Sequence, residues 1–149
     1  MTQEEKQLLL KDLCARIPYR TLVQLNPGAY NKPETCILTG IDGEQVYLNV
    51  DSDPFGIDHI KPYLRPISSI TESEIDKLFD ILYIDKDGED EDWIKINDVV
   101  GIRFFFPTGK YVENVAEAYD CLNSIHLDYR GLIKKGLAIE APEGMYKTK

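Results

Sequence analysis

Five side chains that could carry chemistry lie close together near the C-terminal end of the chain. They are an amide, an imidazole, a carboxylate, a phenol and a guanidinium, at Asn123, His126, Asp128, Tyr129 and Arg130. An imidazole beside a carboxylate can shuttle a proton, and a guanidinium can bind an anion. We therefore take Asn123, His126, Asp128 and Arg130 as candidate ligand-binding residues and assign none of them a catalytic role. His126, Asp128 and Arg130 are the group that a small enzyme would use.

The same cluster also fits a purely structural role. Asp128 has the position of a helix N-cap, flanked by Leu127 and Leu132 as a hydrophobic staple. As a cap, its carboxylate would accept hydrogen bonds from the amides two or three positions further on. His126 and Asn123 would then satisfy the last carbonyl groups of the preceding helix. We favour this structural interpretation because it also explains the staple, and the site remains the alternative.

Metal and cofactor motifs are missing from the sequence. A calcium loop needs oxygen ligands at fixed positions around a glycine. A loop starting at Asp51 puts Phe55 at a ligand position, and one starting at Asp85 has Asp90 in place of the glycine. The two histidines lack metal-ligand spacing, and no nucleophile elbow, phosphate-binding loop or dinucleotide glycine run occurs. We predict no metal and no cofactor.

The charge balance bears on the class of partner. The chain has 26 acidic and 17 basic residues, a net charge of -9. Binding to a phosphate backbone or to anionic lipid depends on clustered Lys and Arg, so the balance disfavours both, although it leaves a local basic patch open. The segment 85–92 is strongly acidic, which we interpret as a solvated loop. Mimicry of nucleic acid by this segment is a further hypothesis.

Cysteine use and hydropathy bear on the compartment. Cys14, Cys36 and Cys121 are too widely spaced for a zinc ribbon or a disulfide framework, which is typical of buried thiols in a reducing compartment. No apolar run approaches the ~20 residues needed to span a bilayer. We expect a cytoplasmic protein without a membrane-spanning segment.

The first half of the chain predicts a helix followed by strands. A helix over 2–16 begins at a capping box of Thr2 and Glu5 and ends before Pro18. Strands are expected at 21–25, 35–41 and 45–50, with an Asp-Gly hairpin turn before the third. The segment 60–66 carries prolines at alternate positions, which suits an edge strand or an extended segment.

The second half predicts more helices. Thr71 and Glu74 form a second capping box, beside an Ile70 and Ile75 staple. Strands follow at 93–96 and 99–106, the latter aromatic, then a helix over 111–124, a short helix from Asp128 and a short strand after residue 137. The fold class is therefore α+β, as one domain over 1–149. We expect an N-terminal helix, an antiparallel β meander that could close into a small barrel, then C-terminal helices with one further aromatic strand.

Two pairs of longer strings carry a resemblance to known sequences. They are KPYLRP with SSITESE, at 61–66 and 68–74, and HLDYRGLI with AIEAPEGMY, at 126–133 and 138–146. With these strings the chain resembles a family of short uncharacterised proteins encoded by Bacteroidales phages, prophages and their hosts. The resemblance covers most of the chain. It implies a mobile-element context, in which small host-directed binding proteins are more common than metabolic enzymes.

The function hypotheses belong to different classes. The leading one is a non-enzymatic protein-interaction module of a phage or prophage accessory repertoire, whose partner is another protein. The alternatives are a nucleic-acid-binding small barrel, which the net charge disfavours, and a small enzyme using His126, Asp128 and Arg130.

Overall fold

The computed structural model describes residues 1–26, 32–50, 52–82 and 115–146. Several predicted elements fall outside these ranges: the acidic loop 85–92, the strands 93–96 and 99–106, and the first residues of the helix 111–124.

The N-terminal helix α1 (Gln3–Arg16) begins at the predicted capping box. The Glu5 amide donates to Thr2 Oγ1 at 3.1 Å, and the Thr2 amide donates to Glu5 Oε2 at 3.0 Å. Two amides that have no partner within the helix are thereby satisfied. Pro18 follows in a single 3-10 turn, and Arg20 then has a left-handed conformation with a φ of 54°. Both ends of the predicted helix are confirmed.

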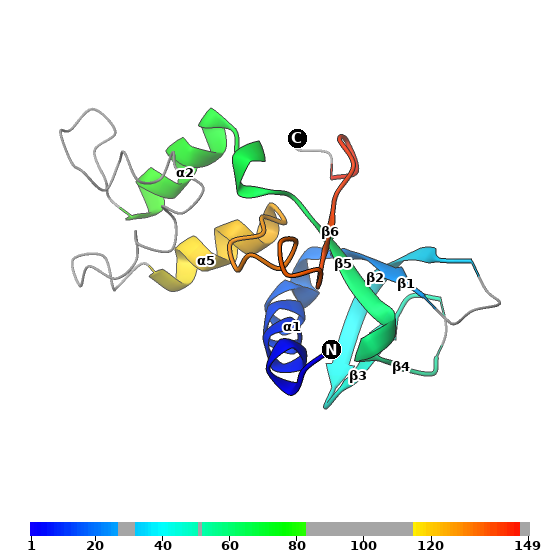
Figure 1. The fold of residues 1–149 in the computed structure, drawn as a ribbon. Coiled ribbons are helices and arrows are strands. Elements are labelled where there is room, and N and C mark those ends of the chain that lie inside the picture. The colour runs from blue at the N-terminus through cyan, green and yellow to red at the C-terminus, as the bar shows by residue number, and fades with distance from the viewer. Residues whose placement is uncertain (27–31, 51, 83–114, 147–149) are drawn as a thin grey trace.

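Six strands form one mixed sheet in the order β4-β3-β2-β1-β5-β6. Their bounds are β1 (Leu22–Leu25), β2 (Glu34–Asp42), β3 (Gln45–Leu48), β4 (Phe55–Gly56), β5 (Ile60–Leu64) and β6 (Ile139–Glu140). The first four form an antiparallel meander, and β5 returns to pair with the other side of β1. β6 comes from the far end of the chain and adds to β5 in parallel (Figure 1). The α+β class and the predicted strands β1, β2, β3 and β6 are confirmed.

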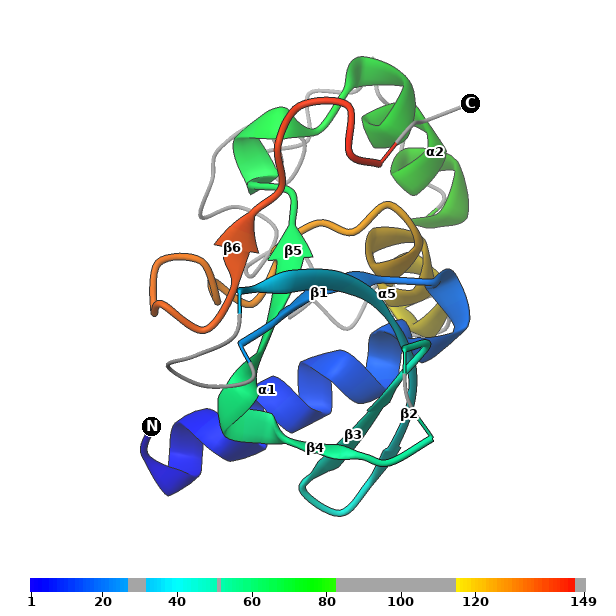
Figure 2. The same ribbon diagram turned by 90° about the vertical axis from the view of Figure 1, so that its right-hand side faces the viewer.

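The meander curves without closing. The β2–β3 hairpin turns at the predicted Asp-Gly pair, where Gly43 has a φ of +61° that L side chains rarely adopt. A register shift between Leu38 and Gly40 bends β2, whose first half pairs with β1 and whose second half pairs with β3. Figure 2 shows the resulting curvature. The two end strands of the described sheet have two residues each and pair only with their inner neighbours, so the meander does not close into the small barrel that the sequence left open.

Of the two alternatives predicted for 60–66, the extended segment is confirmed and the edge strand is wrong, because β5 lies between β1 and β6. Pro62 is opposite Val23 of β1 and has no amide to donate. On its other side β5 pairs with β6 only at Tyr63 and Leu64, beyond the proline. The ladder between β5 and β6 therefore begins after the proline and is not interrupted by it. A short strand from the far end of the chain covers the side of β5 that faces away from β1.

Two helices pack against each other beyond α1, namely α2 (Glu72–Leu82) and α5 (Val115–Ser124). α2 begins at the predicted box: the Glu74 amide donates to Thr71 Oγ1 at 3.2 Å, and the Thr71 amide donates to Glu74 Oε1 at 2.8 Å. In Figure 1 the meander lies on one side of α1, and α2 and α5 lie on the other. α5 contacts both α1 and α2.

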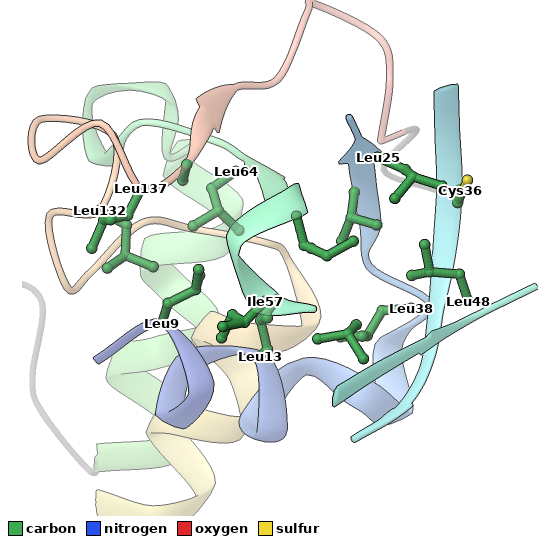
Figure 3. Close-up of a cluster of buried hydrophobic side chains, with 14 residues drawn as sticks. Leu9, Leu13, Leu25, Cys36, Leu38, Leu48, Ile57, Leu64, Leu132 and Leu137 are labelled. Atoms are coloured by element: carbon green, nitrogen blue, oxygen red, sulfur yellow. The ribbon is translucent and has the colours of Figure 1, made fainter. Parts of the chain in front are cut away.

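The buried apolar side chains form two clusters. The larger lies between α1 and the sheet and includes Leu9 and Leu13 (Figure 3). The smaller joins α2 and α5 around Leu122. The segment after α5 connects them, because Leu127 belongs to the smaller cluster and Leu132 to the larger. The two leucines predicted to pack on each other thus anchor this segment in different clusters.

Candidate functional site

The most deeply buried charges of the described chain lie on α1. Asp12 and Arg16 are four residues apart, which places them on one face of the helix. Arg16 Nε donates to Asp12 Oδ2 at 2.8 Å, and Arg16 Nη2 donates to Oδ1 at 3.1 Å. Neither side chain has any solvent exposure. Each ion depends on the other, because an unpaired buried charge strongly destabilises a fold.

This ion pair holds the segment that follows α5. Arg16 Nη2 also donates to the carbonyl oxygen of Leu127 at 2.6 Å, across 111 positions of sequence. Arg130 lies in the same segment, and its Nε is 3.2 Å from Asp12 Oδ1. Both guanidinium groups approach the ring of Tyr129, with Cζ atoms 5.4 Å (Arg16) and 5.1 Å (Arg130) from its centroid. One buried carboxylate therefore serves two arginines.

Asn123 supports Tyr129 instead of capping its own helix. The Tyr129 hydroxyl donates to Asn123 Oδ1 at 2.9 Å, and both side chains are buried. Together with Arg130 and Tyr119 they line a hollow of about 510 Å³ beside α1 and α5. The prediction that the Asn123 side chain satisfies a carbonyl group at the end of its helix is wrong, because this side chain bonds to Tyr129.

Asp128 binds backbone amides, although not in the predicted way. Its Oδ1 accepts from the amide of Leu132 at 2.8 Å, and its Oδ2 accepts from the amide of Ile133 at 2.9 Å. These amides are four and five positions on, where we predicted two or three. The predicted helix is wrong, because the segment 128–138 consists of turns and bends and contains no helix. Gly131 has a φ of 74°, a left-handed conformation that a right-handed helix cannot contain.

His126 lies apart from the rest of the cluster. Its ring stacks on Tyr146, with centroids 3.7 Å apart and planes at 14°, and its Nδ1 is 3.4 Å from Thr21 Oγ1. Burial, with the positive charges of Arg16 and Arg65, lowers the pKa of His126 to about 4. The ring is neutral at pH 7, and a general acid or base works best with a pKa near the working pH. The predicted bond from His126 to a helix carbonyl is replaced by this stack.

A second ion pair joins the end of β5 to α2. Arg65 Nη1 and Nη2 donate to the two Glu74 oxygens at 2.7 and 2.9 Å. The same guanidinium donates to the carbonyl oxygens of Ser69 at 2.8 Å and Ile125 at 3.2 Å. Burial alone would raise the pKa of Glu74, but hydrogen bonds from Arg65 and Thr71 outweigh it, so the pKa is lowered. Arg65 is therefore committed to internal contacts.

The Arg65 backbone also fixes the candidate residues. Its amide donates to the His126 carbonyl at 2.7 Å, and its carbonyl accepts from the Asp128 amide at 2.8 Å. Sequence reasoning did not single out Arg65, Asp12 or Arg16. A signal for the last two was present, since they occupy the third and seventh positions after Leu9 on the buried face of α1.

A groove lies between α2 and the C-terminal segment. Its larger part has a volume of about 700 Å³ and is lined by Arg20, Lys77, His126 and Tyr146, among others. A second part of about 470 Å³ is lined by Arg65, Glu140 and Glu143, and it shares Thr71 and Tyr146 with the first. We call the two parts together the α2 groove.

The structure therefore divides the predicted site. His126 lines the α2 groove, whereas Asn123 and Arg130 line the hollow beside α1. Asp128 lines neither of these hollows and binds the amides described above. The four candidate residues do not converge on one space. Tyr146, which sequence reasoning missed, lines both parts of the groove, as does Thr71.

The described residues carry no group of three or more His, Cys, Asp or Glu side chains that could hold a metal ion. No helix among them is long and apolar enough to cross a membrane. The three cysteines are free thiols, of which Cys36 and Cys121 are buried. Cys14 is exposed, so the expectation of burial is wrong there.

No protein-family model matches the chain, and neither the curated proteins nor the solved structures include one with significant similarity to it.

Proposed function

We propose that the chain is a non-enzymatic protein-interaction module that holds its partner in the α2 groove. The observation that carries the proposal is the lining of this groove. Tyr19, Met145 and Tyr146 are partly exposed there, beside the exposed Arg20 and Lys77. Tyrosine, methionine and arginine are enriched at protein interfaces, and a cleft of several hundred Å³ has room for the side chains of a bound segment.

The contacts of the polar cluster support a non-enzymatic role. An acid–base or anion-binding centre needs its groups to face one space with free donors and acceptors. His126 is stacked and has its pKa lowered to about 4, and Asp128 accepts from two backbone amides. Arg130 pairs with the buried Asp12 on the other side of the segment. The hydrogen bonds, ion pair and stacking of these side chains stabilise the fold and leave few free donors or acceptors for catalysis.

The architecture and the charges disfavour the nucleic-acid alternative. That hypothesis relied on a closed small barrel, and the described sheet is open. Arg20 and Lys77 are two cations in a groove whose other part carries Glu140 and Glu143. Backbone phosphates are bound by runs of several cations, so this arrangement suits a protein partner better.

The resemblance to Bacteroidales phage and prophage proteins gives the proposal its setting. In that setting the partner is a protein of the bacterial host, and the module belongs to an accessory repertoire.

Affinity capture from a Bacteroidales lysate tests the proposal. The full tagged chain should retain a specific protein. A Ser73→Trp variant should lose it, because Ser73 is an exposed groove residue on α2 and an indole there fills the cleft. Lys11→Trp is the matched control, since Lys11 is exposed on α1 and lines none of the hollows described above. Equal capture by the Ser73 variant, or no capture above background by folded wild-type protein, would contradict the proposal.

A further inference from the structure

We infer that the α2 groove selects a bipolar peptide segment, which places acidic side chains beside Arg20 and Lys77 and basic side chains beside Glu140 and Glu143. The inference rests on the proposed function and adds the chemistry of the partner. It is drawn from how the charges are arranged along the groove.

The two parts of the groove have opposite charges. Arg20 and Lys77 line the larger part, and Glu140 and Glu143 line the smaller. All four side chains are exposed. Within the part of the chain that the structure describes, none of the four forms an ion pair or a side-chain hydrogen bond. Their charges therefore face the groove without an internal counter-charge.

The other ionisable groups along the groove do not change the opposite charges of its two parts. Glu74 lines the larger part and Arg65 the smaller, but they form a bidentate pair with each other. His126 is neutral at pH 7 because its pKa is about 4. The net charge of the larger part is thus positive and that of the smaller part negative, in a chain whose overall charge is -9.

The two ends meet at a fixed aromatic side chain. The Leu22 amide donates to the Tyr146 hydroxyl at 2.9 Å, and this hydroxyl donates to the Tyr63 carbonyl at 2.8 Å. The ring is also stacked on His126. Tyr146 therefore offers a held ring for an apolar residue of the partner, with one charged end on each side. A rigid aromatic anchor flanked by opposite charges sets the register of a bound segment.

Charge pattern here contributes specificity more than affinity. An exposed ion pair is worth about 0.2–1 kcal/mol, so four such contacts bind weakly by themselves. A segment with its charges reversed or scrambled meets like charges, which lowers its affinity further. We expect about a tenfold preference for the matching pattern over a scrambled one.

Fluorescence anisotropy with two synthetic peptides tests the inference. One peptide has glutamates at one end, lysines at the other and a tyrosine between alanine spacers, and the second has the same composition with the charges alternating. The full chain should bind the first peptide about tenfold more tightly than the second. Equal affinities, or no binding of either peptide, would overturn the inference.

Variants of each end decide whether both take part. Arg20→Glu with Lys77→Glu should weaken binding of the first peptide about tenfold, and so should Glu140→Lys with Glu143→Lys. Lys11→Glu with Lys61→Glu changes the net charge as much as the first pair does, at exposed positions outside the groove, and should leave the affinity unchanged. Dependence on the cationic end alone, or tighter binding of a single-stranded oligonucleotide, would replace the inference with a simple anion site.

These outcomes are separable from the test of the proposed function. A partner captured from lysate in a Ser73-dependent way, but indifferent to both charge-reversal pairs, would refute the inference and leave the interaction module standing.

Discussion

Replacing Asp128 with alanine tests the packing of the segment that carries the candidate residues. The carboxylate accepts hydrogen bonds from the amides of Leu132 and Ile133, and Asp128 itself is buried. A buried amide left without a partner costs about 1–3 kcal/mol. Leu132 is fully buried, whereas Ile133 is partly exposed and its amide can find water. We therefore expect Asp128→Ala to lower the free energy of unfolding by about 2–4 kcal/mol.

Asp128→Asn gives the internal comparison. Its single amide oxygen can keep one of the two hydrogen bonds, but its amino group faces the other N–H and cannot accept. We expect a loss of about 1–2 kcal/mol, between wild type and alanine. Urea unfolding at pH 7, followed by circular dichroism, measures both values. Glu143→Ala is the matched control, because that exposed carboxylate has no contact of this kind, and it should stay within about 0.5 kcal/mol of wild type.

A stability of Asp128→Ala equal to that of wild type would refute this account of the carboxylate. A ligand-binding Asp128 predicts the opposite pattern, in which neither variant loses stability and both lose binding alike.

Three further predictions concern the buried network. Arg16→Met should cost about 3–5 kcal/mol in urea unfolding. Adding Asp12→Leu should recover part of that loss, because the double variant leaves no buried charge on α1, and Arg130, which loses the same carboxylate, is partly exposed to water. His126 has its pKa lowered from 6.5 to about 4, so its neutral ring stabilises the fold fully above pH 6.5 and this contribution is lost as the pH falls towards 4. At pH 5 the loss is about 2 kcal/mol. His126→Asn cannot titrate, and asparagine tolerates the left-handed backbone at this position. The variant should therefore show a correspondingly smaller fall in the free energy of unfolding between pH 7 and pH 5. Tyr146→Phe should lower stability by about 1–2 kcal/mol in thermal or urea melts, since the Leu22 amide and the Tyr63 carbonyl both lose their partner; an unchanged melting curve would contradict that contact.

The elements that the sequence predicted correctly are those stabilised by contacts between near neighbours. Thr2 with Glu5 and Thr71 with Glu74 are three residues apart, and each pair formed its capping box. The turn at Gly43 likewise needs only its own positive φ. Such signals lie within one turn of chain, so a single sequence contains all of the information that they require.

Most of what the sequence failed to predict depends on contacts between distant parts of the chain. The position of β5 depended on β6, which lies far away in sequence, and Arg16 reaches the Leu127 carbonyl across 111 positions. The predicted helix at Asp128 failed for a local reason that carried too little weight. A glycine in a helix interior costs about 1 kcal/mol relative to alanine, and Gly131 takes up a left-handed conformation instead. The long-range contacts then favoured a turn.

The candidate site shows the same difference between what near neighbours in sequence determine and what distant contacts determine. Spacing grouped Asn123, His126, Asp128 and Arg130, but the turns of this segment point them into different spaces. The α2 groove combines residues that follow α1, lie on α2 and come from the C-terminal segment. No local pattern links those three positions, so only the fold reveals the groove.

Photo-crosslinking from inside the groove tests the central claim most directly. A photoreactive phenylalanine derivative placed at Ser73 lies in the α2 groove, and the same residue at Lys11 lies on α1 outside it. After irradiation in a Bacteroidales lysate, the Ser73 position should yield a covalent adduct with one host protein, and the Lys11 position should yield none. An adduct from Lys11 without one from Ser73, or no adduct from Ser73 under conditions where the wild-type chain captures its partner, would contradict binding in the groove.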